Sequence, residues 1–229
     1  MLSRRFASSF LTFFITLALV VGVASTAVAH DHGDAEEGGD YDSAAAAYDI
    51  DAVHSSVVFR IKHLDVGYVY GMFRGFEGDF KFDEDNPENS EVNFTIETDS
   101  VFTNVEDRDD HLRSPDFFAA EEHPELTFES TSVEEYHSDD AYEVTGDLTI
   151  RGTTEEISFV ADEVGQGEGM EGEFRRGFET TFAVNRMDYG VDFMPDGLGE
   201  TVRVTIAFQG IEHEENGDDH DDEDHDDEE

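Results

Sequence analysis

The sequence predicts an all-β protein, with a closed antiparallel barrel favoured over a sandwich. Between the chain ends, apolar residues alternate with polar ones, as expected for strands that bury one face. Clusters of Gly, Pro, Asn, Asp and Ser separate these segments, and no helical period fills the gaps. Short connections favour antiparallel neighbours, and closure into a barrel removes exposed sheet edges.

Eight strands are expected, each identified by a run of alternating residues. In chain order, the residues that share a face are Val57, Phe59, Ile61 and His63; Phe76, Gly78, Phe80 and Phe82; Val92, Phe94 and Ile96; Leu126 and Phe128; Tyr142, Val144, Gly146, Leu148 and Ile150; Ile157 and Phe159; Phe178, Thr180, Phe182 and Val184; Val202, Val204, Ile206 and Phe208. Turns are expected at residues 83–90, 137–141, 151–156 and 164–173. A short irregular or helical insert, residues 99–124, separates the third and fourth strands.

The chain ends differ in composition from the segment between them. Residues 1–29 have the pattern of a secretory signal: Arg4 and Arg5, a short apolar run, and small residues that end at Ala29. Residues 30–46 and 212–229 are rich in acids and poor in apolar residues, so we expect them to be disordered. The sequence thus predicts an exported protein, periplasmic or beyond, that is soluble after signal cleavage and has no stable membrane anchor.

The folded part of the chain is strongly acidic. The whole sequence has 13 Lys+Arg and 58 Asp+Glu, and residues 43–211 keep 11 of these bases and 39 of these acids, a formal charge of −28. Such a surface repels phosphate backbones, which excludes ordinary nucleic-acid binding. Acids in excess with few lysines suggest adaptation to concentrated salt, which screens self-repulsion. No cysteine is present, so the core alone must stabilise the fold.

Four ordered blocks resemble one known family. They are YDIDAVHSSVVFRIKHL (48–64), RDDHLRSPDFFAAEEHPELTFEST (108–131), GDLTIRGTTEEISF (146–159) and NRMDYGV (185–191). In order and spacing these blocks resemble the YceI-like family of exported proteins, over a barrel domain of residues 47–211. The resemblance implies an extended, lipocalin-like, eight-stranded barrel that holds a polyisoprenoid or similar long-chain amphiphile, for storage or transport. It leaves a homodimer open.

Two kinds of residue are candidates for ligand binding. An apolar chain would contact the inward side chains Phe59, Ile61, Phe76, Phe80, Phe94, Phe117, Phe118, Phe128, Leu148, Ile150 and Phe182. A phosphate or carboxylate head would favour Arg108, Arg113 and Arg186, with His111 as a further donor. The alternative for the apolar set is a solid core. For the arginines it is ion pairing, of Arg108 with Asp109 or Asp110 and of Arg186 with Asp188.

The chain ends suggest a second function. Cleavage after Ala29 would expose His30 and His32 at the new terminus, where the amine, two amides and the third-position imidazole can bind Cu(II) or Ni(II). His213, His220 and His225 could add weak sites among carboxylates. The alternative function is therefore metal buffering, with the barrel as a scaffold, whereas the barrel itself requires no cofactor.

A catalytic function has little support in the sequence. His111 or His54 could act as a base and Ser55 as a nucleophile, but adjacent strand residues point to opposite faces. Residues 43–211 contain no GxSxG nucleophile elbow, no HExxH metalloprotease motif and no glycine-rich phosphate-binding loop. We therefore expect a binding protein rather than an enzyme.

Overall fold

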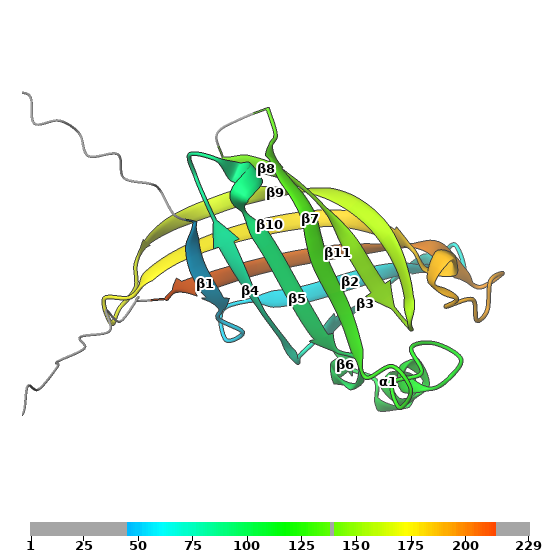
Figure 1. Cartoon of the computed structure of the whole chain (residues 1–229). Coiled ribbons are helices and arrows are strands. Elements are labelled where there is room, and N and C mark those ends of the chain that lie inside the picture. The colour runs from blue at the N-terminus through cyan, green and yellow to red at the C-terminus, as the bar shows by residue number, and fades with distance from the viewer. Residues whose placement is uncertain (1–44, 138–139, 214–229) are drawn as a thin grey trace, which may run out of the picture. The chain divides into compact units, whose positions relative to one another are not determined.

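A computed structural model describes residues 45–137 and 140–213 (Figure 1). In this part of the chain one antiparallel sheet contains eleven strands. They are β1 (Ala46–Ile50), β2 (Ser56–His63), β3 (Gly67–Phe73), β4 (Phe76–Phe82), β5 (Glu91–Glu97), β6 (Val101–Phe102), β7 (Glu125–Glu135), β8 (Ala141–Ile150), β9 (Thr153–Glu168), β10 (Phe174–Asn185) and β11 (Leu198–Glu212). The helices are α1 (Glu106–Arg113) and the 3-10 turns η1 (Pro87–Asn89), η2 (Thr98–Ser100) and η3 (Arg186–Tyr189).

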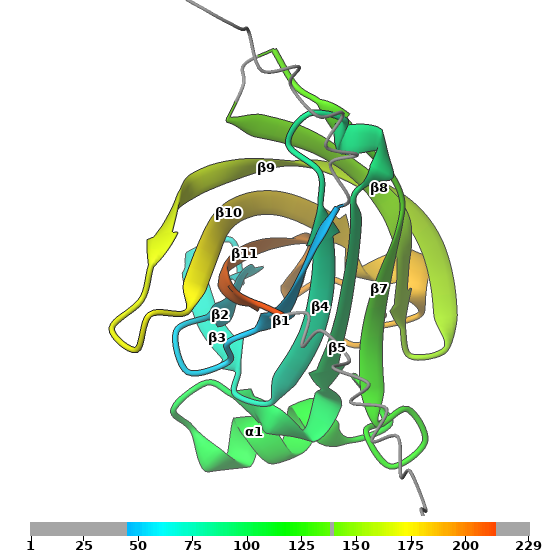
Figure 2. The same cartoon turned by 60° about the vertical axis from the view of Figure 1, so that its left-hand side comes forward.

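Eight strands close into a barrel, in the order β1, β4, β5, β7, β8, β9, β10 and β11. The ring closes because β1 pairs with both β4 and β11, where Tyr48 lies opposite Phe80 and Glu212 respectively. Figure 2 shows β9 and β10 arching over the interior, with β4, β5 and β7 on the facing side. The predicted eight-stranded antiparallel barrel is confirmed, and the helix α1 lies in the predicted insert.

The other three strands extend the sheet beside β11. Strand β1 pairs with β11 over Gly210–Glu212, and β2 pairs with it over Leu198–Ala207. Strand β3 follows β2 as a hairpin, and β6 pairs with β3 through Met72 and Phe102. The sequence identified β2 but missed β1, β3 and β6. It also placed β2 among the eight ring strands, whereas β1 takes that place at the closing seam.

The connections between strands are shorter than predicted at two places. The turn between β8 and β9 consists of Arg151 and Gly152, with φ of 52° and 72°, as in the tight turns that suit hairpins. The expected glycine-rich turn at 164–173 is mostly strand, because β9 continues to Glu168 and its glycines pair with β10 across a bulge at Gly177. Only residues 169–173 connect β9 and β10.

Aromatic rings form a plug at the end of the barrel that β1 closes. Phe80 is 1% exposed and stacks on Tyr48 with a centroid distance of 4.6 Å. The rings of Phe178 and Phe208 meet Phe80 edge-on at 5.7 and 5.6 Å. A Cβ at Gly210 would overlap the Phe80 ring, so this glycine makes room for it. Burial of such a ring stabilises the fold by roughly 3 kcal/mol or more.

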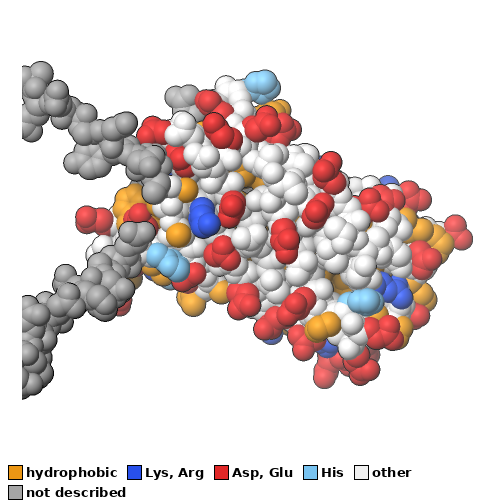
Figure 3. All heavy atoms as spheres, viewed as in Figure 1, with side chains coloured by type: hydrophobic (Ala, Val, Ile, Leu, Met, Phe, Trp, Pro, Cys, Tyr) orange, Lys and Arg blue, Asp and Glu red, His pale blue; other side chains and the backbone are white. Residues whose placement is uncertain are grey.

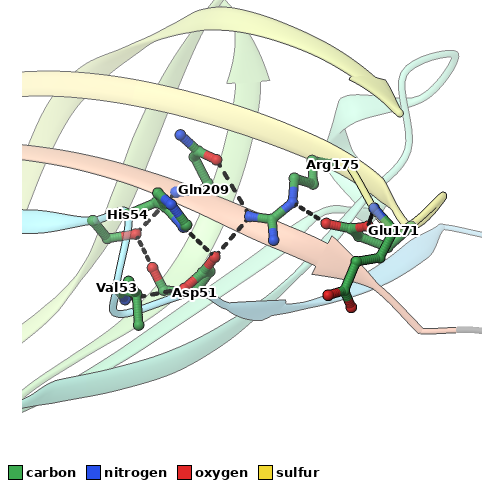
Figure 4. Close-up of polar contacts among 8 residues, drawn as sticks. Asp51, Val53, His54, Glu171, Arg175 and Gln209 are labelled. Atoms are coloured by element: carbon green, nitrogen blue, oxygen red, sulfur yellow. Dashed lines mark hydrogen bonds and ion pairs between the residues drawn. The ribbon is translucent and has the colours of Figure 1, made fainter. Parts of the chain in front are cut away.

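A polar cluster ties the β1–β2 link to β10 and β11 (Figure 4). The Asp51 carboxylate accepts hydrogen bonds from Arg175 Nη1 and pairs with His54 Nδ1, each at 2.7 Å. Arg175 Nε also donates to Glu173 at 2.7 Å. The bonds from Arg175 and His54 lower the pKa of Asp51 to about 2. The carboxylate therefore stays ionised at neutral pH and attaches the β1–β2 link to β10 through Arg175.

The outer surface is acidic. Figure 3 shows Asp and Glu side chains over much of the visible face of the barrel, with few Lys or Arg among them.

Within residues 45–137 and 140–213, no helix has the length and apolar character needed to cross a membrane. The strands begin at Ala46 and end at Glu212, one residue outside the predicted barrel at each end. The predicted signal peptide lies outside the described residues.

Candidate ligand-binding cavity

The barrel encloses a cavity of about 520 Å³. Its walls are almost entirely apolar, because β2, β5, β7, β8, β10 and β11 each turn alternate side chains inward. Phe59 on β2, Phe128 on β7 and Phe182 on β10 are examples. The volume lies within the range of ordinary ligand pockets, about 300–1,000 Å³. The interior is therefore a hollow core, and the alternative of a barrel packed solid with side chains does not hold over this region.

The structure brings most of the predicted binding residues to this cavity. Those that line it are Phe59, Ile61, Phe94, Arg108, His111, Phe117, Phe118, Phe128, Leu148, Ile150, Phe182 and Arg186. Strand residues form the walls. Phe117 and Phe118 follow α1 and reach the cavity from its end, where the Phe118 ring meets Phe73 edge-on at 5.7 Å.

Three predicted residues lie outside the cavity lining. Phe80 belongs to the aromatic cluster at the closed end, and Phe76 is buried in the same core. Arg113 points away from the cavity: its Nε donates to Asp99 O at 2.7 Å, and its Nη1 pairs with Asp110 at 2.9 Å. Period-two alternation cannot separate a side chain that lines a hollow from one that fills the plug beside it.

Two rim segments, residues 103–118 and 186–194, meet at the cavity end opposite the plug. Arg151 joins them, since Nη1 donates to Gly190 O and Nη2 donates to Pro115 O, both at 2.8 Å. Five polar residues of the cavity lining come from these segments: Thr103, Arg108, His111, Arg186 and Tyr189. Three others, His63, Thr127 and Thr180, lie on β2, β7 and β10. This end is where a polar part of a ligand would meet polar side chains.

Arg108 is anchored within its own rim segment. Its Nε donates to Thr103 Oγ1 at 2.7 Å, and its Nη2 donates to Thr103 O at 2.8 Å. The buried Asp109 carboxylate accepts from Thr103 N at 2.8 Å and from the Thr103 hydroxyl. The alternative of direct pairing of Arg108 with Asp109 or Asp110 is wrong. Thr103 lies between Arg108 and Asp109, and Asp110 pairs with Arg113.

Arg186 is held by main-chain carbonyls. Only 4% of it is exposed, and its guanidinium donates to the carbonyl oxygens of Gly199, Val191, Phe193 and Leu198. Burial lowers the pKa of Arg186 below its usual value. The expected pairing with Asp188 is wrong; Asp188 instead accepts from Asn185 at 3.2 Å. Arg186 thus holds the second rim segment against β11.

His111 contributes to the rim through its ring. Nε2 is hydrogen-bonded to Asp116 at 2.9 Å, which fixes the ring orientation. The rings of Phe117 and Phe193 each make a T-shaped contact with this ring, with a centroid distance of 5.0 Å. His111, Phe117 and Phe193 therefore form an aromatic border to the cavity.

Sequence reasoning missed several lining residues, above all Tyr189. This side chain is 2% exposed, and its hydroxyl has no hydrogen-bond partner among the described residues. Burial raises the pKa of Tyr189 to about 12. This residue lies within the NRMDYGV block of the sequence. Val69 and Phe73 were missed because β3 was missed.

The predicted metal and catalytic residues do not assemble in the described part of the chain. His30, His32, His220 and His225 lie outside it, and His213 pairs with Asp49 at 2.8 Å. Residues 45–137 and 140–213 hold no group of three or more side chains suited to a metal ion.

His54 and Ser55 precede β2 rather than lying within it, so the argument from opposite strand faces is wrong. Instead, the Ser55 hydroxyl donates to Asp51 O at 2.7 Å and accepts from Gln209 N at 3.0 Å.

Comparison with known proteins shows which family this chain is similar to. The YceI-like domain matches residues 48–210. Protein YceI of Escherichia coli O157:H7 is 40% identical over 170 residues, which cover 73% of this chain and 88% of the relative. The solved YceI protein of Campylobacter jejuni is 29% identical, with a TM-score of 0.59 over 67% of this chain and 90% of that one.

A polyisoprenoid binding domain from Saccharophagus degradans has the same fold, with a TM-score of 0.56 at 16% identity over 73% of this chain and 99% of that one. The family match and the relatives cover the whole barrel. This chain therefore belongs to the YceI-like family.

Proposed function

We propose that this protein binds a long-chain amphiphile, a polyisoprenoid or a similar lipid, inside the barrel. The observation that carries the proposal is the apolar cavity of about 520 Å³. Apolar walls favour a ligand that is largely hydrocarbon, because burial of apolar surface is the main source of affinity in such a pocket. The polyisoprenoid binding domain of Saccharophagus degradans, which shares the fold, supports a prenyl chain as the ligand.

Binding without turnover fits the contacts of the candidate catalytic groups. The Ser55 hydroxyl and the His54 ring are both bonded to Asp51 at the seam, outside the cavity lining. His111 borders the cavity but is bonded to Asp116. We propose storage or transport of the ligand.

Export is part of the same proposal. Its support is the sequence of residues 1–29, with two arginines, an apolar run and small residues before Ala29. N-terminal sequencing of protein recovered from the exported fraction should begin at His30. Full-length protein retained in the cytosol would contradict export without affecting the binding proposal.

A matched pair of variants on one strand tests the binding proposal. Ile61→Trp places a larger side chain in the cavity, whereas Val58→Trp makes the same kind of change on the opposite face of β2, outside the cavity lining. Binding of tritiated geranylgeraniol to delipidated protein should fall at least tenfold for Ile61→Trp and little for Val58→Trp. Equal binding by both variants and the wild type would contradict a ligand in the cavity.

A further inference from the structure

The cavity ends at the aromatic plug, and the ring of Phe208 belongs to both. The plug contains the rings of Tyr48, Phe80, Phe178 and Phe208. Of these four residues, Phe208 is the one that also lines the cavity. Its ring meets Phe94, a lining residue of β5, at a centroid distance of 5.1 Å, and it meets Phe80 and Phe178 at 5.6 and 5.5 Å. The Phe208 ring therefore forms a border between the hollow and the plug.

The ring of Phe208 points into the interior of the barrel. Strand β11 lines the cavity with Val202, Val204, Ile206 and Phe208, which share one face of the strand. Phe94 lies on β5, and β4 and β1 separate β5 from β11 in the order of the barrel. A contact between the rings of Phe94 and Phe208 must therefore cross the interior.

Two other strands change from cavity wall to plug within one step of the same face. On β10, Thr180 lines the cavity, whereas Phe178, two residues before it, does not. On β8, Val144 lines the cavity, whereas Tyr142 is 3% exposed and lies outside the lining. Residues i and i+2 are neighbours on one face of a strand. The closed end of the cavity is therefore a wall that several strands build together.

The volume of the cavity limits how much of a chain it can enclose. A cavity of about 150 Å³ accommodates one benzene molecule, which gives roughly 25 Å³ per carbon atom. At this packing the cavity of about 520 Å³ encloses about 20 carbon atoms, or about four isoprene units.

The polar lining residues give a bound chain a direction. Thr103, Arg108 and His111 lie at the rim, where a polar head can stay hydrated or meet polar side chains. At the plug end, the Thr180 hydroxyl already donates to Val160 O at 2.7 Å, and its neighbours in the lining are apolar. The hydrocarbon end of an amphiphile would therefore lie deepest and stop at Phe208.

We infer that Phe208 sets the length of chain that the barrel encloses, at about 20 carbon atoms. Carbon atoms beyond this limit stay in water at the mouth, so they add little to the affinity. The inference rests on the proposed function and narrows the ligand class to prenyl chains of about four units, or acyl chains of similar volume. Phe208 is thereby a specificity-determining residue for the ligand.

The test uses a series of prenyl alcohols with three, four, five and six isoprene units. Displacement of bound 1-aminoanthracene from delipidated full-length protein gives each Kd. For the wild type, the Kd should fall at least about tenfold from three units to four, because the added unit is buried, and should change less than about twofold from four units to six.

Phe208→Ala should move this limit to five units. The substitution removes six ring carbons from the closed end of the cavity, which leaves room for about one more isoprene unit. Phe82→Ala is the matched control, because Phe82 is a buried ring that contacts Phe178 at 5.4 Å but lies outside the cavity lining. This control removes the same ring and should keep the limit at four units.

Ala161→Phe tests the same inference in the opposite direction and does not depend on a large-to-small change in the core. Ala161 lines the cavity on β9, where it lies opposite Tyr142 on β8 and Thr180 on β10. A phenyl group at this position fills part of the closed end, so the limit should move to three units.

A limit that stays at four units in both Phe208→Ala and Ala161→Phe would overturn the inference, as would a wild-type Kd that keeps falling through six units. Either result would leave the binding function intact. If no prenyl alcohol displaces the probe from the wild type, the proposed function fails, and this inference fails with it.

Discussion

The Nε atom of Arg186 donates a hydrogen bond to the carbonyl oxygen of Gly199 at 2.9 Å. The bond crosses from η3 to the start of β11, and the same guanidinium also donates to carbonyls within 191–198. Two of the acceptors precede β11, and the other two lie where the pairing of β11 with β2 shifts register between Leu198 and Val202. A planar group with five donors can satisfy several such carbonyls at once. This arginine therefore holds the rim of the cavity in place.

Arg186→Met should destabilise the fold because it leaves several buried carbonyls without a donor. The expected loss in free energy of unfolding is about 3 kcal/mol. Urea denaturation of this variant can be compared with that of Arg203→Met, which changes an exposed arginine on β11. Equal stability of the two variants would contradict the structural role of Arg186.

The Asp51 cluster predicts a dependence of stability on pH. The pKa of Asp51 is lowered from 3.8 to about 2 in the folded state, so its ionised form stabilises the fold above pH 4. That contribution, about 2 kcal/mol, is lost as the pH falls from 4 to 2. Asp51→Asn should therefore be less stable than the wild type at pH 7 by about this amount, and the two should converge near pH 2.

Urea unfolding at a series of pH values measures this difference. Asp65→Asn is the matched control, because Asp65 forms an exposed ion pair with Lys62 at 2.7 Å. Such surface pairs contribute little. A difference between wild type and Asp51→Asn that stays constant from pH 7 to pH 2 would argue against the ionised Asp51 as the source of the stabilisation.

Much of the fold could be predicted from the sequence because strand periodicity is local. The runs around Phe59, Phe94 and Val204 alternate clearly, and each forms a strand in the structure. Strand β1 escaped prediction because it is short and adjoins an acidic segment. Strand β3 escaped because Tyr68 and Tyr70 place aromatic rings on its exposed face, which hides the alternation. Closure through β1 depends on tertiary pairing that no local pattern contains.

The candidate site was only partly predictable for the same reason. Inward residues could be named, but Phe80 and Phe128 look alike in sequence, although the first fills the plug and the second lines the cavity. The partners of Arg108 and Arg186 could not be deduced, because their acceptors are a threonine and main-chain carbonyls. From sequence, an arginine is expected to pair with a nearby carboxylate. In the structure, the carbonyl groups of irregular backbone also need hydrogen-bond donors, and these arginines supply them.

The acidic surface predicts that stability rises with salt. Residues 43–211 have a formal charge of 11 − 39 = −28, and counterions weaken the repulsion among these carboxylates. The thermal midpoint should increase as KCl is raised from about 0.05 M to 2 M, over which the Debye length falls from roughly 14 Å to a few ångströms. A midpoint that does not change over this range would remove the support for adaptation to concentrated salt.

The N-terminal histidines predict a metal site that is separate from the barrel. Protein cleaved after Ala29 should bind one Cu(II) per chain, with an absorbance band typical of square-planar nitrogen ligands. His32→Ala should abolish the band, and His213→Ala, which changes a histidine paired with Asp49, should leave it intact. Copper binding that is unchanged in His32→Ala would refute the terminal site.

If the cavity holds a long-chain ligand, that ligand should accompany the protein through purification. Protein purified from its exported fraction without detergent can be extracted with organic solvent and analysed by mass spectrometry. We expect one prenyl or similar long-chain lipid per chain, and its loss from the Ile61→Trp variant, in which the cavity of about 520 Å³ is partly filled. An extract without stoichiometric lipid, or the same lipid in equal amount from Ile61→Trp, would contradict it.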